Sequence, residues 1–248
     1  MTIFIRNLKL VIAYDGSEFM GWQIQPDVRT LQETVEKALG EILGHPTRII
    51  ASGRTDAGVH AFGQVINFHT KSTIPIDGLI RGLNAILPGD VSVRSAEDVD
   101  PDFHSRYNAK KKSYVYVIDT QDVRNPFLDR YAFHEKYSLD IPAMREAARY
   151  ILGEHDFTSF LASGSSVKTT VRNITVSEVI THGEKVLFWI QGSGFLRYMV
   201  RNIVGTLLLV GRGRRAPEDM ECIIALKDRS CAGPTAPPQG LYLIGVEY

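Results

Sequence analysis

The most chemically informative stretch of the chain is a short loop in which Asp56 follows Arg54 by two residues and is framed by Gly53 and Gly58. Glycine lets a backbone take positive φ or approach a ligand closely. A carboxylate held in such a loop can act as a nucleophile, a general base or a metal ligand. The alternative is a solvated turn in which Asp56 caps a neighbouring strand or helix. This loop alone favours that plainer interpretation.

Metal binding at Asp56 would need further oxygen or nitrogen ligands nearby. His60 lies four residues on, but Gly58 between them argues against a shared helix face, and no second cluster of His, Asp or Glu has ligand spacing. The chain also contains neither a GxGxxG sequence nor a Walker loop. We therefore expect no metal and no small-molecule cofactor.

Two arginines, Arg197 and Arg201, fall four residues apart in an apolar stretch that predicts a helix over 195–210. A guanidinium on a largely buried helix needs a carboxylate partner, because an unpaired buried charge is costly. We expect Arg201 to pair with Asp56 and keep it ionised, ready to attack or to accept a proton. Arg197 is expected to reach water instead.

Tyr114 and Tyr116 share one face of a strand predicted over 112–120, directly after the basic run Lys110, Lys111 and Lys112. Aromatic side chains beside a basic run suit a stacked base with phosphates nearby. Alternating tyrosines are also common in half-buried strands, and spacing alone favours that interpretation.

The overall charge does not identify a nucleic-acid binder, since 28 basic side chains balance 28 acidic ones. The charges are nevertheless segregated along the chain. Residues 105–118 and 192–217 carry several Lys or Arg and no acid. Acidic residues gather instead near 97–102. Such segregation fits either a positive binding face or two solvated surface patches.

The composition of the 248 residues is that of an ordinary globular protein, with 44% hydrophobic and 23% charged residues. Two cysteines provide no disulfide framework. The N-terminus lacks the apolar run of a signal peptide, and no apolar window approaches the roughly 20 residues of a membrane span. We expect a cytoplasmic protein with no membrane association.

Helices and strands alternate along the chain, and many neighbouring strands look like hairpins. This predicts an α+β fold with a central, mostly antiparallel sheet flanked by helices, in two similar halves over residues 1–105 and 106–248. A Thr30–Glu33 capping box begins the first helix. Strands are expected at 8–14, 62–69, 91–97, 112–120, 170–181, 185–191 and 241–246, and helices at 31–43, 77–86, 141–152, 195–210 and 217–226.

Four separated motifs, in order, are similar to those of the tRNA pseudouridine synthase A family. They are GRTDAGVHA (53–61), KKKSYVYVI (110–118), GFLRYMVRNIVG (194–205) and RSCAGPTAPPQGL (229–241), and YDGSEFMGWQIQP (14–26) fits as well. The resemblance spans nearly the whole chain.

The resemblance implies an isomerase that converts uridine to pseudouridine at positions 38, 39 and 40 of the tRNA anticodon stem-loop, without metal or cofactor. It implies that Asp56 is the nucleophile, that Tyr114 packs against the target uracil, that Arg201 pairs with the aspartate and that Arg54 helps hold the flipped-out nucleotide. It also implies the pseudouridine synthase fold and a homodimer that binds tRNA across both subunits.

The residues agree with this chemistry and leave parts of it open. Asp56 could attack C1′ or C6 or take a proton from the ribose, and Lys110, Lys111 and Lys112 could follow the RNA phosphates. One alternative is a non-catalytic RNA-binding α+β module, which leaves Asp56 unexplained. Another is a hydrolase that uses Asp56 and His60 as an acid–base pair.

Overall fold

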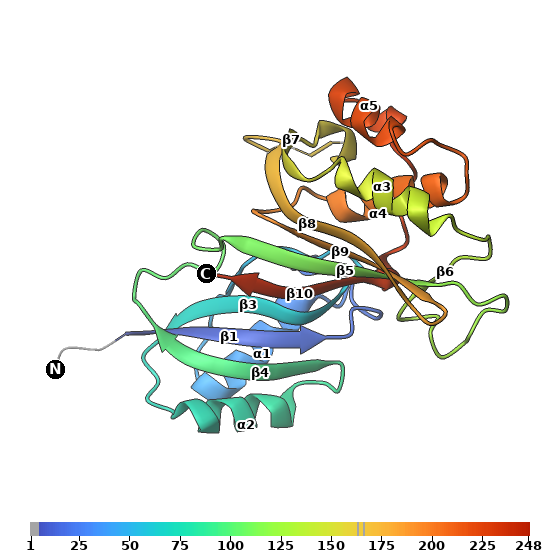
Figure 1. Cartoon of the computed structure of the whole chain (residues 1–248). Helices are drawn as coiled ribbons and strands as arrows, with labels where there is room; N and C mark the ends of the chain where they lie inside the picture. Colours follow the sequence, from blue (N-terminus) through green and yellow to red (C-terminus); the bar gives the residue numbers. More distant parts are fainter. Residues whose placement is uncertain (1–4, 163, 166) are drawn as a thin grey trace. The chain divides into compact units, whose positions relative to one another are not determined.

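The computed structural model describes residues 5–162, 164–165 and 167–248. The chain forms two compact units, each with its own strands and helices (Figure 1). Unit 1 consists of residues 1–110 and 243–248, and unit 2 of residues 111–242. Strand β10 (Leu241–Glu247) therefore begins in unit 2 and continues in unit 1.

Unit 1 is built on an antiparallel sheet in the order β4-β1-β3, where β1 is Arg6–Tyr14, β3 is His60–Thr70 and β4 is Val91–Val99. The two-residue strand β2 (Ile50–Ala51) pairs with β3. The unit 1 part of β10 lies on the other side of β3 from β1. Helices α1 (Leu31–Leu43) and α2 (Ile76–Ile86) complete the unit.

The alternation of side chains along β1 explains why this strand forms. Leu8, Leu10 and Ile12 are at most 1% exposed, while the residues between them are partly exposed. Helix α1 buries Leu31, Val35 and Leu39, which recur at helical spacing. The strand and the helix therefore each bury the apolar face that their periodicity predicts.

Unit 2 is built on the antiparallel order β5-β9-β8-β7, where β5 is Lys111–Asp119, β7 is Gly153–Asp156, β8 is Val171–His182 and β9 is Lys185–Gly192. The short strand β6 (Phe133–His134) pairs with β5 in parallel. Its helices are α3 (Ile141–Arg149), α4 (Met199–Gly211) and α5 (Asp219–Leu226). Three 3₁₀ turns, η1 (Thr158–Phe160), η2 (Arg229–Cys231) and η3 (Pro238–Gly240), lie in its loops.

Most predicted elements are present, and the α+β class with a mostly antiparallel sheet is confirmed. The β8–β9 hairpin turns at Gly183, which has φ 57°. The sequence reasoning missed β6 and β7, because two-to-four-residue strands carry too little periodicity to be seen.

Two local predictions are wrong. The helix expected from residue 195 begins at Met199, so Arg197 lies before α4 and does not share a helix face with Arg201. The capping box also fails: Thr30 occupies the N-cap of α1, but its hydroxyl makes no capping bond among the described residues. Glu33 instead pairs with Lys37 at 2.8 Å, one turn along the helix.

Candidate functional site

The Asp56 loop joins β2 to β3 in unit 1, and its first residues are tied to β3. The backbone N–H of Ser52 donates to the carbonyl of Val65 at 2.8 Å, and its hydroxyl donates to the side-chain oxygen of Gln64 at 2.7 Å. The amide of Gln64 in turn donates to the carbonyl of Gly53 at 2.8 Å. Ser52 and Gln64 are both fully buried. The chain therefore enters the loop at a defined position.

The segment 15–30, between β1 and α1, supports the same loop by its backbone. The N–H of Trp22 donates to the carbonyl of Thr55 at 3.0 Å, and the N–H of Gly58 donates to the carbonyl of Phe19 at 3.3 Å. These two bonds flank Asp56 on either side. The Asp56 backbone is therefore held by a segment that lies more than 25 residues away along the sequence.

Gly21 shows how closely the two segments approach. It has φ 89°, and a Cβ there would lie 3.1 Å from the carbonyl oxygen of Thr55 and 3.4 Å from the carbonyl carbon of Asp56. Only glycine accommodates both that φ and that spacing without displacement. The glycine of the GWQ sequence thus lets segment 15–30 lie directly on the Asp56 loop.

Tyr14 and Thr55 make a buried polar contact beneath the loop. Their hydroxyl oxygens are 2.8 Å apart, and either hydroxyl can be the donor. Burial raises the pKa of Tyr14 well above its usual range, so the phenol stays neutral. This neutral contact fixes the residue immediately before Asp56.

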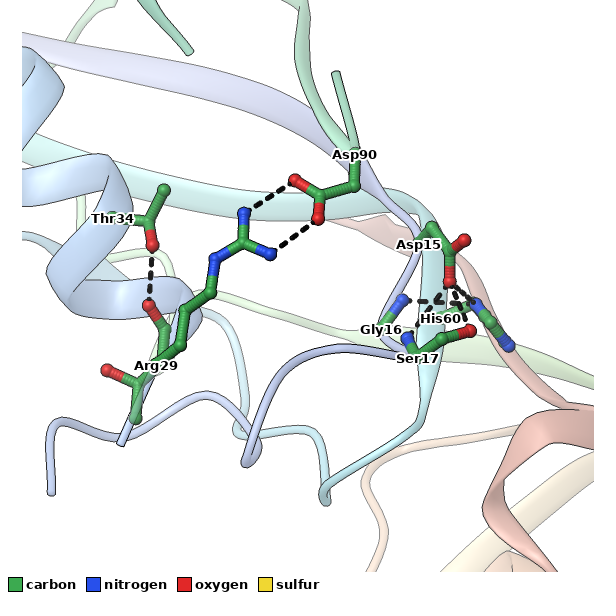
Figure 2. Close-up of polar contacts among 8 residues, drawn as sticks. Asp15, Gly16, Ser17, Arg29, Thr34, His60 and Asp90 are labelled. Carbon is green, nitrogen blue, oxygen red and sulfur yellow. Dashed lines mark hydrogen bonds and ion pairs between the residues drawn. The ribbon is translucent and has the colours of Figure 1, made fainter. Parts of the chain in front are cut away.

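His60 occupies the first position of β3, where it connects the Asp56 loop to the end of β1 (Figure 2). Its Nδ1 lies 3.1 Å from the backbone nitrogen of Gly16, which donates to it, and 3.2 Å from a carboxylate oxygen of Asp15. The same Asp15 oxygen accepts from the N–H and the hydroxyl of Ser17, at 2.9 and 2.6 Å. By accepting from the Gly16 N–H, the 2%-exposed His60 has a positioning role in the turn after β1.

The far end of segment 15–30 is fastened by Arg29. Its two terminal nitrogens lie 2.7 and 2.8 Å from the two carboxylate oxygens of Asp90, a bidentate pair visible in Figure 2. Its guanidinium also lies 4.0 Å above the ring of Phe19. At the start of α1, the Thr34 hydroxyl donates to the carbonyl of Thr30 at 2.9 Å. Segment 15–30 is thereby anchored at both ends.

Arg54 lies in the same loop as Asp56 and has an exposed side chain. Of the predicted site residues, these two are brought together by one short loop of unit 1. Lys110 is also exposed and ends unit 1, where its N–H donates to the carbonyl of Glu247 at 2.8 Å. Lys111 and Lys112 begin β5 in unit 2 and are partly exposed.

Tyr114 lies on β5 with its ring on the same face as Tyr116 and Ile118. Its ring meets that of Phe195 edge to face, with centroids 5.1 Å apart and an interplanar angle of 81°. Tyr116 is completely buried and donates its hydroxyl to the carbonyl of Pro237 at 2.8 Å. Both tyrosines are buried, with Tyr114 8% exposed, but their contacts differ. Tyr116 bonds to the loop over 229–240, and Tyr114 packs beside the loop that precedes α4.

Arg201 lies in the first turn of α4, where its side chain is directed by the loop over 229–240. Its Nε donates to the carbonyl of Ala236 at 2.7 Å, and the N–H of Ala236 donates to the carbonyl of Arg201 at 3.0 Å. Its guanidinium lies 5.0 Å from the ring centre of Tyr198. These contacts restrict the guanidinium to one orientation within unit 2.

The 229–240 loop is fixed by its contacts with α4. A Cβ at Gly205 would lie 1.7 Å from the carbonyl oxygen of Pro234, so the loop backbone lies against the helix where that side chain would be. The buried Asn202 donates to the carbonyl of Phe160 at 2.8 Å and accepts from the hydroxyl of Thr235 at 2.6 Å. The Gly- and Pro-rich loop, whose role the sequence did not reveal, therefore holds Arg201 in place.

Sequence reasoning missed several supporting residues. Phe195, Tyr198 and Ala236 carried no signal of their own, since one aromatic, one tyrosine and one alanine in a loop have no distinctive spacing. Segment 15–30 could have been suspected only from the motif resemblance. The predicted Asp56–Arg201 pair stays a prediction, because Asp56 belongs to unit 1 and Arg201 to unit 2.

Within residues 5–162, 164–165 and 167–248, no three His, Cys, Asp or Glu side chains group in a way that could hold a metal ion. In the same residues, no helix has the length and apolar character needed to cross a membrane.

Comparison with known proteins places this chain in a family. Residues 10–108 and 147–248 match the family model described as tRNA pseudouridine synthase. The chain is 49% identical over 245 residues to the tRNA pseudouridine synthase A of Anoxybacillus flavithermus, covering 98% of this chain and 99% of that protein. It is 46% identical over 244 residues to the protein of the same name from Exiguobacterium sp., covering 98% of each.

A looser likeness exists to a solved Cbf5-Nop10-Gar1 complex, with 17% identity and a TM-score of 0.33, covering 81% of this chain and 54% of the other. The chain belongs to the tRNA pseudouridine synthase family and is an isomerase that modifies RNA.

Proposed function

We propose that this enzyme converts uridine to pseudouridine at positions 38, 39 and 40 of the tRNA anticodon stem-loop, with Asp56 as its nucleophile. The observation that carries the proposal is the way the Asp56 loop is held, by backbone hydrogen bonds from segment 15–30 on both sides of the carboxylate. A loop fixed in this way can present one oxygen to a substrate at a constant position. A solvated capping turn would not need that support.

The reaction breaks the N1–C1′ glycosidic bond and forms a C5–C1′ bond in its place. The proton on C5 leaves to solvent and N1 takes one up, so no oxidant or reductant is required. Asp56 starts the reaction by attacking C1′ or C6, or by removing a proton from the ribose. The target uridine must first leave the base stack to reach the carboxylate.

The other predicted residues have distinct parts in this proposal. Tyr114 packs against the everted uracil and keeps it from escaping while it turns. Arg201 pairs with Asp56 and keeps it ionised. Arg54 helps hold the everted nucleotide, and Lys110, Lys111 and Lys112 contact the RNA backbone. Their support is the fixed orientation of Arg201, the edge contact of Tyr114 and the exposure of Arg54 and Lys110.

We further propose that the enzyme works as a homodimer in the cytoplasm, with one tRNA contacting both subunits. Sedimentation equilibrium tests the dimer directly, because a single species of monomer mass at micromolar concentration would contradict it. A mixing experiment tests whether one tRNA uses both subunits. It combines two inactive variants, one substituted in unit 1 of the chain and the other in unit 2. Recovered activity in the mixture is the expected result.

The proposed chemistry is tested by tritium release from tRNA labelled at uracil C5, since the isomerisation must expel that hydrogen. The wild type is expected to release tritium, and Asp56→Asn is expected to bind tRNA but release none. An RNA-binding module would release none with either protein. Equal release from both proteins would exclude Asp56 as the nucleophile, and a matched Asp122→Asn change on an exposed loop serves as control.

A further inference from the structure

Unit 2 contains a cavity of about 650 Å³ that the proposed chemistry does not use. The cavity lies where the loop before α4 meets the loop after α5. It is lined by Ala162, Arg197, Tyr198, Asp228 and Arg229, together with residues 230 and 232–235 of the loop after α5. Two arginines and one aspartate are its charged side chains, so the described walls carry a net positive charge.

Arg229 contributes a positive charge that its hydrogen-bond partners do not neutralise. Its terminal nitrogens donate to the carbonyls of Ala232 and Gly233, at 3.4 and 2.9 Å, and to the side-chain oxygens of Asn202 and Thr235, at 3.0 and 3.3 Å. All four acceptors are neutral. Burial accordingly lowers the pKa of Arg229, the direction expected for a cation away from water. An anion in the cavity would stabilise this charge.

The terminal N–H groups of Arg229 already donate to the protein, so Arg197 is the residue that can donate to an anion. Its side chain is exposed, and its guanidinium lies 4.8 Å from the ring centre of Tyr198, with Nη2 3.3 Å from the Tyr198 hydroxyl. Its carbonyl accepts from the N–H of Ala162 at 3.0 Å, which fixes its backbone at the cavity wall. The Arg197 guanidinium therefore lies over an aromatic ring, and its N–H groups can donate to an oxyanion.

Tyr198 reaches this position through an unusual backbone conformation. It has φ 63° and ψ 0°, in the left-handed region that a bulky residue rarely adopts. Such a conformation costs on the order of 1–2 kcal/mol and persists where surrounding contacts require it. In this conformation the centre of the Tyr198 ring lies 4.8 Å from the guanidinium carbon of Arg197 and 5.0 Å from that of Arg201.

Asp228 determines which part of the cavity an anion would occupy. Its carboxylate accepts from the backbone N–H of Ser230 at 2.8 Å, and this bond holds the pKa of Asp228 below its usual range. The ionised carboxylate repels an anion from that end. The opposite wall, formed by Arg197 and Tyr198, remains favourable.

We propose that this cavity binds a backbone phosphate of the RNA substrate, with Arg197 as its direct ligand, Arg229 as a fixed positive charge and Tyr198 as an aromatic wall. This inference rests on the proposed function, because it takes the ligand to be RNA. A free nucleotide carries the same phosphate chemistry, and the test below separates the two sources. A backbone phosphate is the better fit because the Arg197 side chain is exposed, so a phosphate that is part of a large RNA can reach it.

The test measures the tRNA dissociation constant against salt in the Asp56→Asn background, where no turnover occurs. The variants are Arg197→Ala and Arg197→Gln, which remove the charge, and Arg149→Ala, which removes an exposed charge of the same unit outside the cavity. Loss of one phosphate contact should reduce the slope of log K against log salt by about 1. We expect that loss in both Arg197 variants and an unchanged slope in Arg149→Ala.

A competition arm identifies the source of the phosphate. Uridine 5′-monophosphate is added at constant ionic strength and compared with uridine. If the nucleotide displaces tRNA from the Arg197-containing protein only, while Arg197→Gln leaves the salt slope unchanged, the cavity binds free nucleotide and the RNA assignment is overturned. An equal slope loss in Arg149→Ala would also overturn it, because the effect would then be general electrostatics.

Turnover with Asp56 intact separates this inference from the proposed function. Arg197→Gln should raise KM for tRNA several-fold and leave kcat within about twofold. Failure of the proposed chemistry appears instead as absent tritium release in the wild type, which leaves the binding measurements interpretable. An unchanged KM together with an unchanged salt slope in Arg197→Gln overturns the phosphate site.

Discussion

Arg201 and Ala236 exchange two hydrogen bonds across 35 residues of sequence: the Arg201 Nε donates to the Ala236 carbonyl at 2.7 Å, and the Ala236 N–H donates to the Arg201 carbonyl at 3.0 Å. One bond orients the guanidinium, and the other fixes the loop that orients it. Helix α4 and the loop over 229–240 therefore position the Arg201 guanidinium together. A substitution in either should affect the orientation of Arg201.

Replacing Arg201 with alanine should reduce catalysis far more than tRNA binding. The proposed partner, Asp56, would lose the cation that keeps it ionised, whereas most of the RNA-binding surface would be unaltered. We expect single-turnover rates to fall about 100-fold or more, with the tRNA dissociation constant changed less than about threefold. Arg201→Lys keeps the charge but loses the planar Nε–H donor, and should be intermediate. Full activity in Arg201→Ala would contradict the pairing.

Replacing Tyr114 with phenylalanine should leave tRNA affinity nearly unchanged. The ring and its edge contact with Phe195 at 5.1 Å would remain. Tyr114→Ala removes both, and stacking on an aromatic side chain is worth about 1–3 kcal/mol per base, so affinity should fall about 5- to 150-fold. Filter binding at fixed salt measures both variants. A large loss of binding in Tyr114→Phe would show that the hydroxyl, and not the ring, makes the contact.

Replacing Gly21 with alanine should disturb the Asp56 loop specifically. The new Cβ would press on Thr55 and on the Asp56 backbone at 3.1–3.4 Å, in addition to the strain of φ 89°. Gly44→Ala is the matched control, since Gly44 has φ 72° with nothing within 4 Å of the added Cβ. Both variants should lose about 1 kcal/mol of unfolding free energy from backbone strain.

The two glycine variants are distinguished by turnover. Only Gly21→Ala should lower kcat, by about tenfold or more, because only there does the methyl group contact the segment that carries Asp56. Circular dichroism melting reports the shared loss of stability, and tritium release reports the difference. Equal kcat in the two variants would mean that segment 15–30 does not position the carboxylate.

Acid stability should depend on Asp156. Its carboxylate accepts from the Thr158 hydroxyl at 2.6 Å and pairs with Lys227 at 3.0 Å, and these contacts hold the pKa of Asp156 well below its usual range. A depressed pKa contributes stability that is fully present above the unfolded-chain pKa of about 4 and declines as pH falls toward the folded pKa.

The Asp156→Asn variant should therefore be less stable than the wild type at pH 7, and the gap should narrow between about pH 4 and pH 2. Urea unfolding at each pH measures it. Glu154→Gln, on the same short strand β7, is the control with an exposed acid. A gap that stays constant down to pH 2 would show that ionisation of Asp156 is not the source of the stability.

Local pattern alone determined much of this protein. The alternation of Leu8, Leu10 and Ile12 fixes which face of β1 is buried, and the helical spacing of Leu31, Val35 and Leu39 does the same for α1. Gly53 and Gly58, on either side of Asp56, indicated a loop between two strands. In the structure Asp56 lies in the loop between β2 and β3. These features depend on neighbours within one or two turns, so the sequence contains them directly.

Tertiary structure decided the features that depend on segments far apart in the chain. It set Gly21 against the Asp56 loop, distinguished Tyr114 from Tyr116, directed Arg201 through Ala236, and left the Thr30 hydroxyl without its capping bond. It also forced Tyr198 into a left-handed conformation and so began α4 four residues later than its apolar run predicts. Packing and hydrogen bonds between distant segments outweigh a local preference worth about 1 kcal/mol, and no periodicity records which segments will meet.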